Sequence, residues 1–236
     1  MYFSRVRIDT SSATQTMLLR IFQGDAYAAH KLIWKLFPGD PGSKRTFLFR
    51  QEYEKEQLSS GDSRRGLPIY YVLSEKHPKP IDGLITVETK PYEPKLTTSL
   101  RLCFDLRANP VVARTVHGKK NSAKHDVLMD AKKQAKQQKT ANASAIKSAM
   151  NQAAIDWLNS RSAKHGFHLI CPPLVEVSGY QQHYLKKRSG LGITFSSIEL
   201  AGSLEVTDPD SFKMLLLNGI GSARSFGCGM MMIRPA

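Results

Sequence analysis

The order of predicted elements repeats along the 236-residue chain, and this repetition restricts the possible folds more than any other feature of the sequence. Each half begins with a strand, continues through a helix and two strands, and reaches a closing strand after a second helix or a loop. The Lys90–Pro94 segment contains two prolines and is the predicted linker between the halves. We therefore expect an α+β fold of two tandem ferredoxin-like (RRM-like) domains, at residues 1–93 and 98–236.

The individual elements are predicted from apolar periodicity and from turn residues. In the first domain we expect a helix at residues 25–37, a polar loop that contains Ser59–Asp62, and strands at residues 2–9, 46–50 and 67–73. In the second domain the predicted strands are residues 100–106, 167–170, 180–185, 193–206 and 230–233. Asp208 and Pro209 predict the start of a helix that runs to about Asn218, where Gly219 ends it.

The stretch from Lys119 to Lys147 is rich in Lys, Gln and Ala, which favour a helix. Its apolar residues reach helical spacing only near the end and beyond, at Ile146, Met150, Ala153, Trp157 and Leu158. These five predict one packed helix face. The part before Ala143 is predicted to be an exposed basic helix or extension of the second domain.

The charge of the chain points to a polyanionic partner. Lys and Arg number 34 against 20 Asp and Glu, which gives a formal net charge of +14. An excess of this size causes self-repulsion that a polyanion relieves, and nucleic acid is favoured over an anionic membrane surface because no basic amphipathic helix with a broad apolar face is found. With neither a secretory apolar region nor a run long enough to span a membrane, we expect a cytoplasmic protein without a membrane partner.

Neither the cysteines nor the histidines predict a metal site. Cys103, Cys171 and Cys228 are isolated thiols without a C-x-x-C pair, which argues against a disulfide framework and against structural zinc. His165 and His168 are three residues apart but flank Gly166, and the remaining histidines show no ligand spacing on a common helix face. We therefore expect no metal and no cofactor, and we expect Cys228 to serve packing.

The predicted first helix has one apolar and one polar face. On a helical wheel, one side collects Ala26, Ala29, Leu32, Ile33 and Leu36. The other side collects Tyr27, His30, Lys31, Trp34 and Lys35. A histidine can transfer protons near neutral pH, and a lysine can stabilise a phosphorane, so this face suits RNA cleavage by the 2′-hydroxyl of the RNA itself. A single histidine on a helix face is commonly an ordinary surface residue, however, and the constellation alone does not establish an active site.

A glycine-rich segment lies between the last helix and the last strand. Residues 219–229 contain Gly219 and Gly221, five residues, and then Gly227 and Gly229. The segment lacks the G-K-S/T ending of a P-loop, and it does not follow a first strand as a Rossmann fingerprint does. A double G-h-G pattern that closes a basic chain of two ferredoxin-like units is typical of the CRISPR repeat-processing endoribonucleases.

Within that superfamily the chain resembles the CasE family, the endoribonuclease subunit of the type I-E Cascade complex. The resemblance extends over both domains and is weakest from Lys119 to Ala143. Four stretches carry it, namely Met1–Val6, Tyr27–Pro38, Phe104–Pro110 and Gly219–Gly229. The resemblance implies metal-free cleavage of the CRISPR repeat RNA hairpin at the base of its 3′ side, which leaves a 2′,3′-cyclic phosphate and a 5′-hydroxyl. The implied partners are this RNA, the crRNA made from it and the other Cascade subunits.

The resemblance also implies site residues. Tyr27 and His30 match the active-site spacing of the family, and Lys35 matches the lysine that steadies the scissile phosphate. Lys31 is a candidate RNA contact, and the family's basic hairpin maps onto Lys186, Lys187 and Arg188, at the predicted tip between two strands. Further candidate RNA contacts are Arg107 and the glycines 219, 221, 227 and 229, although we expect the glycine loop to support the second domain and the RNA path and not the chemistry.

Two other functions remain open at this point. A non-catalytic RNA-binding subunit of a CRISPR ribonucleoprotein predicts no histidine on the first helix, so His30 counts against it. A general basic RNA chaperone predicts no cut at a defined position. A cleavage assay on the repeat RNA distinguishes these possibilities.

Overall fold

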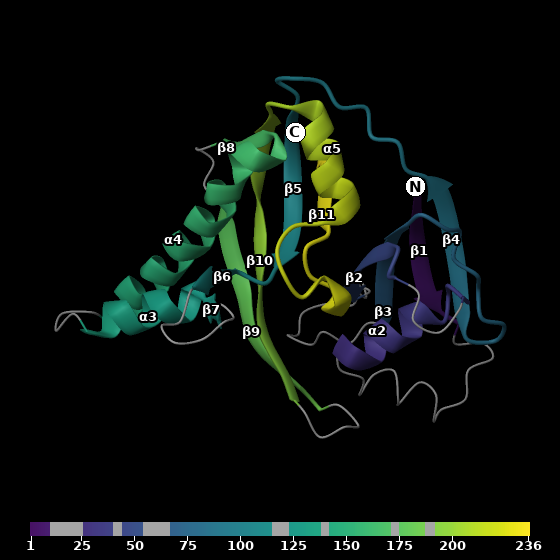
Figure 1. The fold of residues 1–236 in the computed structure, drawn as a ribbon, viewed down its shortest axis with the longest axis horizontal. Coiled ribbons are helices and arrows are strands. Elements are labelled where there is room, and N and C mark those ends of the chain that lie inside the picture. Colours follow the sequence, from purple (N-terminus) through teal and green to yellow (C-terminus); the bar gives the residue numbers. More distant parts are fainter. Residues whose placement is uncertain are drawn as a thin grey trace, which may run out of the picture. The chain divides into compact units, whose positions relative to one another are not determined.

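A computed structural model of the chain describes residues 1–9, 26–39, 44–53, 67–114, 123–137, 142–170, 175–186 and 192–236 (Figure 1). These residues form two compact units. The first comprises Met1–Pro94 together with Arg224–Gly227, and the second comprises Lys95–Ala223 and Cys228–Ala236. Four residues of the glycine-rich segment thus group with the first unit, although they follow most of the second in sequence.

The first unit is a four-stranded antiparallel sheet with a helix on one face (Figure 1). Its elements are β1 (Tyr2–Ile8), α2 (Ala26–Trp34), β2 (Phe47–Tyr53), β3 (Pro68–Ser74) and β4 (Ile85–Pro91). The strands lie in the order β2-β3-β1-β4, which is the ferredoxin-like order. Alternation decides the buried face, because Val6 on β1 and Val72 on β3 point into the core that Ile33 of α2 completes.

Strand β4 extends into the segment that was predicted to be the linker. Lys90 and Pro91 belong to the predicted linker, but they are the last two residues of β4, and Pro91 pairs with Tyr2 of β1. Proline is tolerated here because β4 is an edge strand and Pro91 is its final residue. Between β3 and β4 the chain forms turns, with an isolated bridge from Ile81 to Ile85, in place of a second helix.

The second unit is a five-stranded sheet with the same underlying order. Its strands are β5 (Arg101–Ala108), β8 (Phe167–Ile170), β9 (Glu176–Lys186), β10 (Gly192–Val206) and β11 (Met231–Pro235). The path β11-β5-β10-β8 repeats the order of the first unit, and β9 is added to β10. The expectation of two ferredoxin-like units is therefore confirmed. β10 is long enough to pair with β9 through its first part and with β8 through its last four residues.

The helices of the second unit are α3 (Val127–Gln137), α4 (Ala143–Ser162) and α5 (Pro209–Asn218), with the short helix η1 (Ala163–His165) after α4. Of these helices, α4 and α5 pack against the sheet, and α3 packs along α4. α4 buries Trp157 and Leu158 as predicted, but Ala154 is fully buried in place of Ala153. Asp208 caps α5 through its carboxylate, which accepts from the backbone N–H groups of Asp210 and Ser211, and Gly219 ends the helix, both as predicted.

The predicted exposed basic extension is partly folded. β6 (Val111–Arg114) pairs with β7 (Ala123–Asp126), and α3 follows directly. α3 buries Leu128 in the core and also buries Ala135, while Lys133 and Lys136 are exposed. The stretch is therefore a basic helix with one packed face. Several positions of the sequence predictions lie outside the described residues. They are 115–122, 138–141, the predicted loop with Ser59–Asp62, and Asp25 at the predicted start of α2.

A glycine after η1 fixes the turn that leads from α4 into β8. Gly166 has a φ of 70°, and a Cβ there would overlap the carbonyl oxygen of Asp208 and crowd the backbone nitrogen of Phe212. We predict that Gly166→Ala lowers the free energy of unfolding by roughly 2–4 kcal/mol, because it adds left-handed backbone strain to a steric clash with backbone atoms. Urea denaturation checks this value.

Gly192→Ala is the matched control for this measurement. The added Cβ would lie 3.7 Å from the Leu185 carbonyl oxygen, which is an ordinary contact. The change in the free energy of unfolding should stay below about 1 kcal/mol. Equal stabilities of the two variants would contradict the proposed steric role of Gly166.

Candidate active site

Helix α2 carries His30 beside its buried face. Ala29, Ile33 and Leu36 are buried against the first sheet, and this confirms the predicted apolar side. Lys31 and Lys35 are exposed, whereas Tyr27, His30 and Trp34 are only partly exposed. The polar face is therefore more enclosed than the helical wheel predicted.

The enclosure comes from the glycine-rich segment. Its short helix η2 (Arg224–Phe226) contacts both α2 and β2 within the first unit. The ring centre of Phe226 lies 5.9 Å from that of His30, and Gly227 is buried next to Phe49 of β2. We expected this segment to serve the second domain and the RNA path, but part of it forms a wall of the candidate active site.

The four glycines of the segment have a structural reason to be glycine. All four have φ values between 73° and 86°, a left-handed backbone conformation that residues with side chains rarely adopt. They are Gly219, Gly221, Gly227 and Gly229. At Gly221 a Cβ would also lie 3.1 Å from the Trp157 ring. These constraints account for the double G-h-G pattern by backbone geometry, and contact of the glycines with RNA stays a prediction.

His30 is held by hydrogen bonding at one ring nitrogen. The indole N–H of Trp34 donates to Nε2 of His30 over 3.1 Å. Because an indole nitrogen can only donate, Nε2 carries its lone pair, and the proton of the neutral ring is assigned to Nδ1. Nδ1 is buried and makes no hydrogen bond of ordinary geometry with the described residues. This arrangement favours the neutral imidazole.

Burial and nearby cations also favour the neutral ring. Desolvation lowers the pKa of His30 from its ordinary value of 6.5, an interaction with the Ser225 backbone raises it, and the positive charges of Arg45 and Lys31 lower it further. The net direction is downward, so at neutral pH His30 is predominantly unprotonated and able to accept a proton.

Tyr27 and Lys31 lie on the same side of α2 as His30. The rings of Tyr27 and His30 are nearly parallel, with centres 6.3 Å apart, and the Lys31 ammonium lies 4.3 Å from the centre of the Tyr27 ring. The structure thus gathers a phenol, an imidazole and an ammonium group at one place, as the helical spacing predicted. Their roles in cleavage stay a proposal.

Lys35 occupies a different position. It is exposed in the turn that follows α2, and the cations that act electrostatically on His30 are Arg45 and Lys31. Arg45 precedes β2, and its neighbour Arg224 begins η2. Sequence reasoning missed both arginines, since neither lies on the helix that carries His30 and only folding brings them together.

The candidate RNA contacts of the second unit are less fully described. The Arg107 guanidinium forms an ion pair with Glu199, its partner across β5 and β10, so a phosphate would have to compete with this carboxylate. Lys187 and Arg188 lie outside the described residues, and of Lys186 only the backbone is described, as the last residue of β9. The predicted position of this cluster between two strands agrees with the pairing of Lys186 with Gly192.

The described residues contain neither a candidate metal-binding cluster nor a candidate membrane-spanning helix. No group of three His, Cys, Asp or Glu gathers there in an arrangement that could hold a metal ion. Of the helices in those same ranges, none is both long and apolar enough to cross a membrane. Cys228 is buried, as expected for a packing role, and Cys103 is partly exposed, whereas Cys171 lies outside the described part of the chain.

The chain is similar to known proteins over its whole length. A family model described as CRISPR associated protein matches residues 1–235. The CRISPR system Cascade subunit CasE of Escherichia coli (strain K12) is 25% identical over 224 residues, which cover 94% of this chain and 98% of that protein. The CRISPR-associated endoribonuclease Cse3 of Thermus thermophilus is 26% identical over 156 residues, which cover 62% of this chain and 61% of that protein.

A solved structure supports the fold. The structure of the CRISPR endoribonuclease Cse3 bound to a 19 nt RNA superposes with a TM-score of 0.70 at 20% identity, and the match covers 99% of each chain. The fold and the family match thus define the chain as a CRISPR-associated protein, and it belongs to that family. Within the family it is a CasE-type member, which confirms the resemblance carried by the four sequence stretches.

The hydrogen bond from Trp34 yields a prediction about the pKa of His30. We predict that Trp34→Phe raises this pKa, because the indole N–H can bond only to the unprotonated ring and so stabilises the neutral form. An NMR titration of the histidine ring protons measures the pKa in both proteins. His183 of the second unit, whose pKa burial also lowers, is an internal control that should not move. A His30 pKa that is unchanged or lower in the variant would contradict the assigned hydrogen bond.

Proposed function

We propose that the protein is a metal-independent endoribonuclease that cuts the CRISPR repeat RNA hairpin to make crRNA and stays bound to the 3′ hairpin as a Cascade subunit. The family match supports this proposal, and so do two relatives, one named a Cascade subunit and the other an endoribonuclease. The net charge of +14 suits a partner that carries one negative charge per phosphate.

The observation that carries the proposal is the environment of His30. A partly buried, predominantly neutral imidazole lies between Tyr27, Trp34 and Phe226, with the positive charges of Lys31 and Arg45 in electrostatic range. A solvated surface histidine needs none of these contacts. A histidine that must accept a proton next to a phosphate benefits from all of them, because the cations attract the phosphate and burial keeps the ring unprotonated.

The reaction assigned to this site is an internal transesterification. The 2′-oxygen of the RNA forms a bond to the adjacent phosphorus, and the bond from phosphorus to the 5′-oxygen of the next nucleotide breaks. The proton of the 2′-hydroxyl passes to a base, and a proton is delivered to the departing 5′-oxygen, so that the products are a 2′,3′-cyclic phosphate and a 5′-hydroxyl. His30 is the proposed proton-transfer group, as base, acid or both.

The hydrogen bond from Trp34 indicates how substrate engages His30. The lone pair of Nε2 that accepts the indole N–H is the lone pair that a 2′-hydroxyl must reach in order to be deprotonated. The 2′-hydroxyl of a bound substrate therefore replaces the indole N–H as the donor to Nε2, and this nitrogen keeps a hydrogen-bond partner. The proposed role of Tyr27, whose ring lies nearly parallel to that of His30, is to orient the ribose or the phosphate through its hydroxyl.

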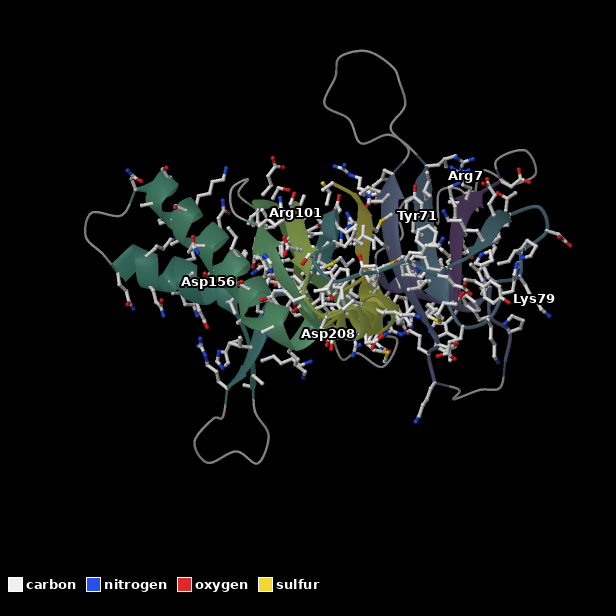
Figure 2. The ribbon with its side chains drawn as sticks, turned by 90° about the horizontal axis from the view of Figure 1, so that it is seen from above. Arg7, Tyr71, Lys79, Arg101, Asp156 and Asp208 are labelled. Carbon is white, nitrogen blue, oxygen red and sulfur yellow. The ribbon has the colours of Figure 1, made fainter. Side chains whose placement is uncertain are left out.

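Replacing the histidine tests the proposal directly. We predict that His30→Ala slows single-turnover cleavage of repeat RNA by about 10²–10⁴-fold, the scale of a lost general acid–base group, and leaves hairpin affinity nearly unchanged. Lys79→Ala is a matched control, since it removes an exposed charge from the connection between β3 and β4 of the first unit (Figure 2). Cleavage at the wild-type rate by His30→Ala would remove His30 from the mechanism, and RNA binding without cleavage by the wild type would favour a non-catalytic subunit.

A modified substrate tests the identity of the nucleophile. A single 2′-deoxy nucleotide on the 5′ side of the cut should abolish cleavage, because the attacking oxygen is missing, and EDTA should have no effect on the natural substrate. Denaturing gels of both RNAs, with and without EDTA, measure this. A cut in the deoxy substrate, or a requirement for added Mg²⁺, would be incompatible with the proposed reaction.

A further inference from the structure

One guanidinium nitrogen of Arg45, which acts electrostatically on His30, is buried and unsatisfied among the described residues. Arg45 lies two residues before β2, with its guanidinium carbon 6.0 Å from the centre of the Phe47 ring. Nη1 is buried and has no hydrogen-bond partner among the described residues, and within the same ranges no ion pair with a carboxylate compensates its charge. A cationic N–H that has lost water without gaining an acceptor is unfavourable, so a partner that supplies acceptors stabilises this position.

The surroundings of Arg45 are positively charged. Arg45 acts electrostatically on Arg224, at the start of η2, and on His30, which Lys31 also approaches. The contact of η2 with α2 and β2 holds these groups in one unit. Burial lowers the pKa of the Arg45 guanidinium, and the like charge of Arg224 lowers it further. An anion bound between two arginines relieves the repulsion between their charges.

We propose that Arg45 and Arg224 together bind the scissile phosphate of the RNA beside His30. This inference rests on the proposed function and gives the two arginines the role that the family resemblance implied for Lys35. A guanidinium group offers parallel N–H donors that match two phosphate oxygens, and two such groups suit a phosphorane whose negative charge increases in the transition state. Arg224 is exposed while Arg45 is partly buried, so the pair is open to an incoming phosphate from the Arg224 side.

A bound phosphate also changes the pKa of His30. The positive charges of Arg45 and Lys31 lower the pKa of the imidazole in the free protein. An anion between the arginines offsets this effect, so the pKa rises when the site is filled. A ring whose pKa moves back toward neutrality can both accept and donate a proton at physiological pH, which the two proton transfers of the reaction require.

Sulfate tests the anion site without any RNA, since its charge is constant over the pH range of a histidine titration. In the wild type, sulfate should raise the NMR-measured pKa of His30 relative to sodium chloride at equal ionic strength. In Arg45→Gln the sulfate-dependent rise should be largely lost, and in Arg45→Lys it should be intermediate because a point charge remains without the planar fork. A rise of the same size in wild type and Arg45→Gln, or no rise in the wild type, would overturn the proposal.

Single-turnover cleavage tests the catalytic consequence. Arg45→Gln and Arg224→Gln should each slow cleavage of repeat RNA by about 10²-fold, the usual effect of removing one preorganised donor to a developing charge. Arg45→Lys should recover part of the rate, and Lys79→Ala should cleave like the wild type. Thermal unfolding of each variant shows whether it is folded, and Arg45→Gln should not be less stable because the lost group was unsatisfied.

The two measurements separate this inference from the proposed function. If His30→Ala abolishes cleavage while Arg45→Gln and Arg224→Gln cleave normally, the phosphate is held elsewhere, Lys35 becomes the next residue to replace, and the proposed function stands. If sulfate raises the pKa of His30 through Arg45 but the wild type cuts no repeat RNA, the anion site stands and the proposed function fails.

Discussion

The packing of Arg224–Gly227 against α2 and β2 is the interaction on which the candidate active site depends. Without this segment His30 would lie on a more open helix face, and its Nδ1 would be accessible to water. With it, the Phe226 ring covers the imidazole, Nδ1 is buried, and Arg224 comes close to Arg45. The hydrogen bond between the Cys228 N–H and the Ala223 carbonyl oxygen, 3.4 Å long, links the two ends of the segment.

The site carries electrostatic costs that folding alone does not compensate. A partly desolvated histidine, an arginine with an unsatisfied nitrogen and a second arginine nearby are each unfavourable in the free protein. Such arrangements persist where a ligand supplies the missing charge, and they are enriched at functional sites for that reason. By contrast, Arg5 with Glu88 on the first sheet and Arg107 with Glu199 on the second are cations already paired with carboxylates.

Local patterns predicted most of the fold because strand alternation, helix periodicity and end signals each act over a few residues. The strands β8 and β10, the capped helix α5 and the apolar face of α2 follow these rules. The predictions failed where a long-range contact overrode the local signal. Pro91 ends a strand only because Tyr2 lies beside it in the sheet. Likewise, α3 has a packed face only because Leu128 reaches a core built from residues far away in sequence.

The sequence by itself determined the class of fold through the repeated order of its elements, and the family through its resemblance over four stretches. Helical spacing also determined the placement of Tyr27, His30 and Lys31 on one face of a helix. Only the tertiary structure decided which other groups surround His30. Trp34 became its hydrogen-bond donor through a particular ring orientation, and Arg45 and Arg224 became neighbours although 179 positions separate them in sequence. Contacts at such a separation depend on how sheet, helix and glycine segment pack together, and no local periodicity encodes them.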